Sequence, residues 1–205
     1  MDEMNKKWDL FLERKEDNTY QIYCDMDGVL VDLEAGIEKK LDTADIELEV
    51  YEKAIQVLHS GQLWQALHQE PGFGEGVDAI FDVLSSGSEV ERESFWAGLP
   101  PEPHMDELWK FISPHNPIIL SAPWTINGGI DQACEEGKRK WLARLDPQPR
   151  KVILTLNKPK HAAENHILID DMLEKYVEPW RSAGGKSIHH TSTKQTIEEL
   201  KKWLK

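Results

Sequence analysis

The chain has few cysteines and no long apolar run. Cys24 and Cys134 are the only cysteines among 205 residues, and no C-x-x-C or H-E-x-x-H spacing offers a zinc site. No window approaches the ~20 apolar residues that span a bilayer, and residues 1–18 lack the apolar stretch of a signal peptide. We therefore expect a cytoplasmic protein without a membrane partner. Cys24 lies in an apolar run, which predicts a buried, inert thiol.

Basic residues are also scarce. The 24 Lys and Arg residues face 37 Asp and Glu residues, and the formal net charge is -13. Such a charge repels a polyanionic backbone wherever no local basic patch overrides it, so polymeric nucleic acid is not an expected partner. With 40% hydrophobic and 30% charged residues, the composition is that of a globular chain with one sizeable core.

Short apolar runs, each bounded by polar or turn residues, predict five strands. They cover residues 20–24, 117–120, 151–154, 166–169 and 186–190. Helical patterns separate most of them, and this alternation is typical of a parallel sheet with crossover helices. The predicted fold class is α/β, a three-layer, doubly wound parallel sheet.

One interval breaks the alternation. Residues 34–96 show helical periodicity without a convincing strand, and this is too long for a simple crossover. We interpret residues 34–96 as an inserted helical cap, residues 19–33 and 97–205 as the core, and residues 1–18 as an N-terminal helical extension. Asp32 and Ser88 are predicted helix N-caps, and Glu91 completes a capping box with Ser88.

Acidic pairs follow two of the predicted strands. Asp25 and Asp27 follow the first strand, and Asp170 and Asp171 follow the fourth. Ligands of doubly wound sheets bind at the carboxyl ends of the strands, so the two pairs are expected to meet there. Clustered carboxylates repel one another and require a hard cation, for which Mg²⁺ fits best.

A hydroxyl group and a set of cations follow two other strands. Ser121 follows the second strand, and Lys158 and Lys160 follow the third. A donor and a fixed positive charge facing a carboxylate-bound metal can hold a phosphoryl group in line for attack. The residues alone leave the choice between the two lysines open.

The order D-x-D-G-x-x-x-D, strand-Ser, Lys, strand-Asp-Asp resembles the four motifs of the haloacid dehalogenase superfamily of phosphotransferases. Within it, four segments are similar to the 5′(3′)-deoxyribonucleotidases. They are D-M-D-G-V-L-V-D-L-E at 25–34, F-W-x-x-L-P-P at 95–101, L-S-A-P at 120–123 and L-I-D-D at 168–171. The resemblance covers roughly residues 20–190 and implies the Rossmann-like core of that superfamily.

The resemblance assigns roles to these residues. Asp25 would be the nucleophile that forms an aspartyl-phosphate, and Asp27 would protonate the leaving oxygen and then activate water. Mg²⁺ would be held by the Asp25 carboxylate, the main-chain carbonyl of Asp27 and Asp170. The implied enzyme is a phosphoric monoester hydrolase acting on 5′-deoxyribonucleotides.

The remaining roles concern the phosphate and its support. Ser121 and a lysine would bind the phosphate, and Asp171 would support the site. We prefer Lys160 over Lys158, because Lys160 precedes Asp170 by ten residues, the spacing associated with this subfamily. Phe95, Trp96 and Trp124 adjoin motif loops and are candidates for a substrate pocket that stacks on a base.

Three positions depart from the subfamily pattern, and they leave the substrate open. Leu33, Ala122 and Met172 stand where the deoxyribonucleotidases tend to carry an aromatic residue, a second hydroxyl group and an arginine. The partner would be a small phosphate ester such as a nucleotide, and a homodimer is left open. One alternative is a phosphatase of nucleic-acid ends or of other small phosphate esters. Another is a catalytically silent nucleotide-binding module.

Overall fold

The computed structural model describes residues 20–60 and 74–204. The helix predicted for residues 1–18 lies outside them. A five-stranded sheet with the order β5-β2-β1-β6-β7 forms the centre, and every pair of neighbours is parallel. Its strands are β1 (Gln21–Cys24), β2 (Ile118–Ser121), β5 (Lys151–Leu154), β6 (His166–Asp170) and β7 (Lys186–His189). All five predicted strands and the α/β fold class are confirmed.

The two faces of the sheet bury alternate residues of each strand. Ile22 and Cys24 join a large apolar cluster with residues of α7, α8 and α10, whereas Tyr23 joins a smaller cluster with Tyr176 and Trp180. Helices therefore cover both faces and make three layers. The helical segments of the core are α7 (Met105–Ile112), η1 (Ser113–His115), α8 (Gln132–Leu142), η2 (Lys158–His161), η3 (Leu173–Val177), α9 (Glu178–Ser182) and α10 (Thr193–Leu200).

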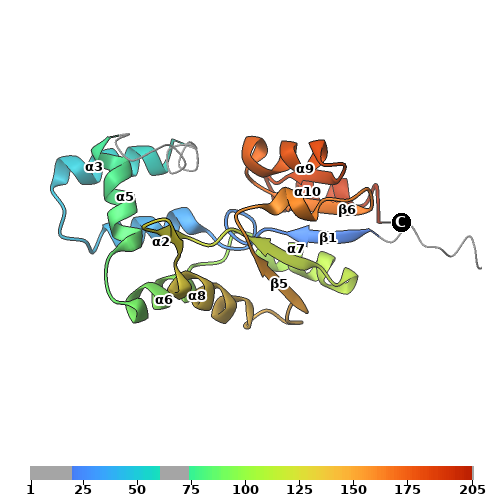
Figure 1. Ribbon diagram of the computed structural model, residues 1–205, viewed down its shortest axis with the longest axis horizontal. Helices are drawn as coiled ribbons and strands as arrows, with labels where there is room; N and C mark the ends of the chain where they lie inside the picture. Colours follow the sequence, from blue (N-terminus) through green and yellow to red (C-terminus); the bar gives the residue numbers. More distant parts are fainter. Residues whose placement is uncertain (1–19, 61–73, 205) are drawn as a thin grey trace, which may run out of the picture.

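Helices of the inserted segment lie at one end of the molecule, away from most of the sheet (Figure 1). Both predicted N-caps are confirmed. The Asp32 carboxylate accepts a hydrogen bond from the Ala35 amide at 2.8 Å, and Ser88 forms the capping box with Glu91. The helices are α2 (Leu33–Leu41), α3 (Leu48–Leu58), α5 (Glu75–Ser85) and α6 (Glu89–Ala97).

Helix α6, which the sequence analysis assigns to the cap, packs along α8 of the core. The contact is close, since a Cβ atom on Gly137 would lie 2.5 Å from the Cβ atom of Trp96. Gly137 thus permits the two helices to approach, and Trp96 is buried between them. Helix α6 therefore contacts the core helix α8, and the division of the chain at residue 96 stays a prediction.

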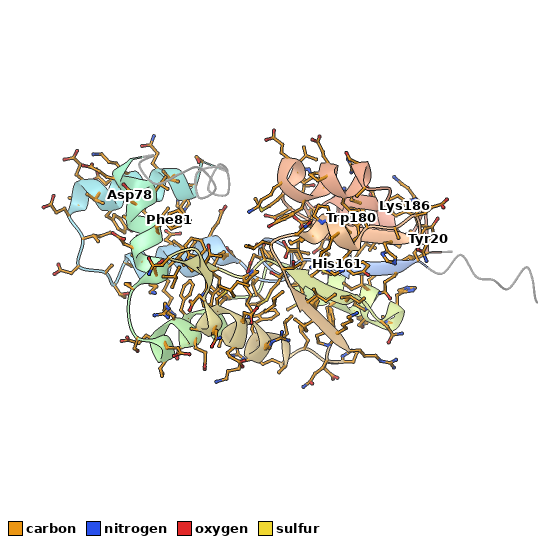
Figure 2. The ribbon with its side chains drawn as sticks, viewed as in Figure 1. Tyr20, Asp78, Phe81, His161, Trp180 and Lys186 are labelled. Carbon is orange, nitrogen blue, oxygen red and sulfur yellow. The ribbon has the colours of Figure 1, made fainter. Side chains whose placement is uncertain are left out.

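A short hairpin follows β2 and extends the core toward the cap. Its strands are β3 (Thr125–Ile126) and β4 (Gly129–Ile130), and both turn residues, Asn127 and Gly128, have positive φ. Figure 2 shows Trp180 and His161 beside the sheet and Phe81 on the cap. Among the described residues, no helix combines the length and the apolar character needed to cross a membrane.

Candidate active site

The ends of β1 and β6 bring three carboxyl groups together. Cys24 lies opposite Ile169 in the parallel pair, so the residues that follow them are neighbours at one edge of the sheet. Side-chain oxygens of Asp25, Asp170 and Asp171 all lie within 4.8 Å of one another. The structure therefore unites the two acidic pairs that the sequence placed after separate strands.

The carboxyl cluster contains more acidic groups than the neighbouring lysine can pair. Lys158 Nζ lies 2.6 Å from Asp25 Oδ2 and 2.7 Å from Asp170 Oδ2, so one ammonium group faces three carboxyl groups. Burial raises the pKa of Asp170 to about 7. Burial, with repulsion from Asp170 and Asp25, raises the pKa of Asp171 well above its usual range. A hard divalent cation fits this set, because carboxylates are its preferred ligands and its charge relieves the repulsion.

Gly28 explains the glycine of the first motif. Its φ is +68°, and a Cβ atom there would lie 2.4 Å from Oδ2 of Asp171. A side chain at this position would displace the Asp171 carboxyl group, so glycine is required both by the backbone conformation and by the close approach. The first and fourth motifs are thus fitted to each other.

Asp25 and Asp27 are held differently. Asp25 Oδ1 accepts a hydrogen bond from the Met26 amide at 2.7 Å, while Oδ2 faces Lys158. Asp27 Oδ2 accepts from Lys138 Nζ, and Asp27 Oδ1 is buried without a hydrogen-bond partner among the described residues. Burial raises the pKa of Asp27, although Lys138 opposes the shift. One oxygen of Asp27 is therefore available to a group that enters the site.

Lys138 is a site residue that the sequence analysis did not single out. It is 1% exposed, and its ammonium group donates to Ser121 Oγ at 3.0 Å and to the Ala122 carbonyl at 2.7 Å, as well as to Asp27. The signal was present, because Lys138 falls on the apolar stripe of α8 with Cys134 and Trp141. A lysine on the buried face of a helix needs a charged partner.

The lysine after β5 is Lys158, and the preference for Lys160 was wrong. Lys158 opens the 3₁₀ turn η2 and is fully buried between Asp25 and Asp170, whereas Lys160 is exposed. Lys158 stands at the strand end, so its side chain can reach the carboxyl groups, and two residues further on the turn has carried the chain to the surface. The number of residues between a lysine and Asp170 does not predict which lysine is buried, because it carries no information on the conformation of the turn.

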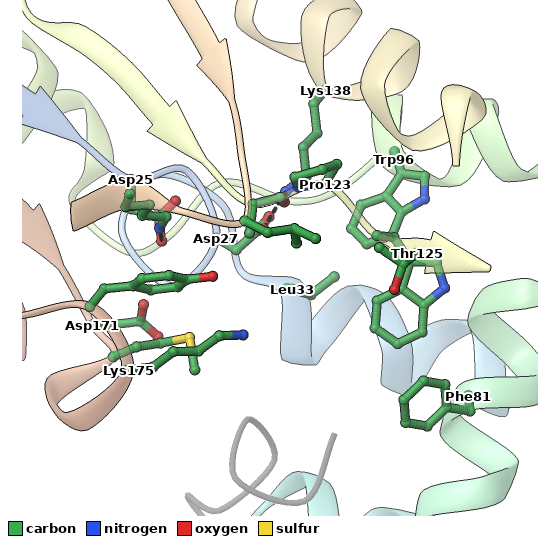
Figure 3. Close-up of a pocket in the computed structure, with 16 residues that line it drawn as sticks. Asp25, Asp27, Leu33, Phe81, Trp96, Pro123, Thr125, Lys138, Asp171 and Lys175 are labelled. Carbon is green, nitrogen blue, oxygen red and sulfur yellow. Dashed lines mark hydrogen bonds and ion pairs between the residues drawn. The ribbon is translucent and has the colours of Figure 1, made fainter. Parts of the chain in front are cut away.

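A cavity of about 340 Å³ opens above these groups. Figure 3 shows Asp25, Asp27 and Asp171 at one end, and Trp96, Thr125 and Phe81 toward the other. Of the predicted pocket residues, Trp96 and Trp124 line the cavity, and Phe95 packs against Trp96 with ring centroids 5.2 Å apart.

The two indoles are not equivalent. Trp96 is 1% exposed and supports Lys138, whose Nζ lies 5.3 Å from its ring centroid. Trp124 is partly buried, lies 4.9 Å from the Phe81 ring, and donates from Nε1 to Ser85 Oγ at 3.3 Å. Since Phe81 and Ser85 belong to α5, Trp124 joins the core to the cap at the rim of the cavity.

The fold is similar to that of several solved structures. L-2-haloacid dehalogenase from Xanthobacter autotrophicus is 14% identical, with a TM-score of 0.53 over 89% of this chain and 82% of its own. The HAD-hydrolase YfnB from Bacillus subtilis, bound to magnesium, is 14% identical, with a TM-score of 0.54 over 90% of this chain and 98% of its own.

A hydrolase from Streptococcus pneumoniae is 16% identical, with a TM-score of 0.50 over 89% of this chain and 99% of its own. No protein-family model and no curated protein matches the sequence. At these identities the comparison concerns the fold alone. The chain has the α/β fold of these haloacid dehalogenase-type structures.

Proposed function

We propose that this protein is a Mg²⁺-dependent phosphomonoesterase that acts through an aspartyl-phosphate on Asp25. The observation that carries the proposal is the second buried carboxyl group, Asp27, beside the nucleophile and with Oδ1 unpartnered among the described residues. An ester oxygen needs a proton to leave, whereas a halide leaves as a stable anion without one. Asp27 therefore favours phosphate esters over the halogenated acids of the similar dehalogenase.

The first step forms the covalent intermediate. Asp25 attacks phosphorus, the ester P–O bond breaks, and the leaving oxygen takes the proton of Asp27. Lys158 lies beside the attacking carboxylate, and Lys138 and Ser121 lie together within the site. These donors are suited to holding the phosphoryl oxygens while charge redistributes.

The second step releases phosphate. Water attacks phosphorus and gives a proton to the Asp27 carboxylate, and the bond between phosphorus and Asp25 breaks. Asp27 thus regains the proton that it donated, and the enzyme returns to its starting state.

Asp25, Asp170 and Asp171 would hold the Mg²⁺ ion, with the Asp27 carbonyl that the motif resemblance adds. The ion supplies charge stabilisation of the transferring phosphoryl group. The magnesium-bound neighbour supports this choice of ion.

We propose 5′-deoxyribonucleotides as the substrates. The motif resemblance supports them, and so does a cavity whose volume lies within the usual range for small-molecule sites. Its lining includes Phe81 and Trp124, two rings near enough to meet a base. The net charge of -13 argues against a polymer with a phosphorylated end.

The decisive experiment measures phosphate release in Asp25→Asn with and without Mg²⁺. We expect turnover of a chromogenic phosphate ester to fall by more than about a thousandfold, with the urea midpoint nearly unchanged. Asp32→Asn is the matched control, because asparagine also caps a helix and Asp32 lies outside the carboxyl cluster. Undiminished activity in Asp25→Asn would refute the mechanism. A rate on an end-phosphorylated oligonucleotide more than about tenfold above that on a mononucleotide, or roughly 1.4 kcal/mol, would reverse the choice of substrate.

A further inference from the structure

A single π-helical turn, η3, carries two residues of the cavity wall that the proposed chemistry does not use. The Met172 carbonyl accepts from the amides of both Tyr176 and Val177 at 3.1 Å. Lys175 and Tyr176 both line the cavity that contains Asp25. Turns of this type are rare and occur frequently at functional sites.

The hydroxyl group of Tyr176 is the first observation. The side chain is 2% exposed, and its hydroxyl has no hydrogen-bond partner among the residues that the structure describes. Burying an unsatisfied hydroxyl group is unfavourable, and phenylalanine would fill the same space without that cost. Burial raises the pKa of Tyr176 to about 12, so the hydroxyl keeps its proton and can donate it.

The position of the ring places this donor beside the phosphoryl end of the cavity. Lys158 Nζ lies 4.2 Å from the centroid of the Tyr176 ring. The Tyr176 hydroxyl is carried on this ring, and Tyr176 lines the same cavity as Asp25 and Lys158. The leaving portion of a substrate bound at Asp25 would share that cavity with Tyr176.

Lys175 adds a positive charge on the same wall. Figure 3 shows its side chain next to Asp171 and directed into the cavity. Its Nζ lies 5.1 Å from the Tyr176 ring centroid. The ammonium group of a lysine normally carries a positive charge at neutral pH, so Lys175 presents a cation to the cavity.

We propose that Lys175 and Tyr176 form a subsite for a second anionic group on the leaving portion of the substrate, a carboxylate or a second phosphate. The inference rests on the proposed phosphomonoester hydrolysis and extends its substrate class, because the nucleoside that leaves a 5′-deoxyribonucleotide carries no second anionic group. An ammonium group and a hydroxyl donor on one partly buried wall gain more from an anionic oxygen than from a neutral acceptor, because charge-assisted hydrogen bonds are about twice as strong.

The test compares substrates in matched pairs. Glycerol 3-phosphate and 3-phosphoglycerate differ by a carboxylate, and deoxyadenosine 5′-phosphate and deoxyadenosine 3′,5′-bisphosphate differ by a phosphate. We expect wild-type kcat/KM to favour the second member of at least one pair, and the favoured pair identifies the anion. In Lys175→Met and in Tyr176→Phe this ratio should fall by about tenfold or more. Lys160→Met, which removes an exposed lysine outside the cavity, should leave the ratio unchanged.

A structural readout is independent of activity. Since the Tyr176 hydroxyl has no partner among the described residues, Tyr176→Phe should unfold at the same urea concentration or a higher one. A lower midpoint would overturn the subsite, because it would mean that the hydroxyl is bonded within the protein. Equal kcat/KM for both members of each pair, or an unchanged ratio in both variants, would overturn it as well. Phosphate release from none of the four esters would instead overturn the proposed function, and the subsite with it.

Discussion

Replacing Lys158 by methionine should lower both the stability and the activity of the protein, and Mg²⁺ should restore only part of the stability. Its ammonium group is fully buried and lies 2.6 Å from Asp25 and 2.7 Å from Asp170, so the variant leaves two buried carboxyl groups without their shared cation. Removing one partner of a buried ion pair costs about 3 to 5 kcal/mol. We expect a loss of this size in the free energy of unfolding, measured in urea without Mg²⁺ at pH 7.

Mg²⁺ should recover part of the lost stability, because a divalent cation in the cluster replaces the missing charge and binds only the folded state. Activity should not recover, since the ion cannot supply the donor beside the nucleophile. Loss of one such donor lowers kcat by about 10²- to 10³-fold. The control is Lys160→Met, with the same change of charge on an exposed side chain. If Lys160→Met lost as much activity as Lys158→Met, the assignment of the lysine would be refuted.

Three other changes test separate parts of the reasoning. Asp27→Asn with a nitrophenyl phosphate should give a burst of about one nitrophenolate per chain and then slow turnover. The nitrophenolate leaves without a proton, but the second step still needs a base. A steady rate without a burst would contradict the two roles of Asp27. Trp124→Ala should raise KM for nucleotides by the ~1 to 3 kcal/mol of base stacking while sparing small esters, and equal loss for both would mean that Trp124 only packs against Phe81. Burial lowers the pKa of His190 to about 4, so the unfolded chain takes up a proton at a higher pH than the folded protein does. The free energy of unfolding should therefore fall by up to about 3 kcal/mol as the pH drops from about 6.5 to about 4. The urea midpoint should depend less on pH in His190→Asn, and an equally steep dependence would show that another group is responsible.

The strands were predictable because each is a short apolar run that ends in polar or turn residues. The end of β6 was set one residue early, since Asp170 belongs to the strand that it terminates. The sequence predicts that β1 and β6 are parallel neighbours only if the acidic pairs at the ends of these two strands are assumed to form one site. The order of the remaining strands came from the structure.

The cation positions were less predictable. Lys138 reaches Asp27 from α8, 111 residues along the chain, and no local pattern joins them. Tyr176 lies in a π-helical turn, which has no sequence signature comparable to that of an amphipathic helix. Both residues depend on how α8 and η3 pack against the sheet, and this is decided by tertiary contacts.

The two buried lysines also tie the site to the core. Lys138 joins α8 to the loop after β1, and Lys158 joins the turn after β5 to both β1 and β6. The phosphoryl end is therefore fixed by core elements alone. Among the described residues that line the cavity, α2 and α5 contribute Leu33 and Phe81, both apolar. Substitutions at Phe81 should consequently change which leaving group is accepted without altering the first chemical step, whereas any change at Lys138 or Lys158 acts on every substrate.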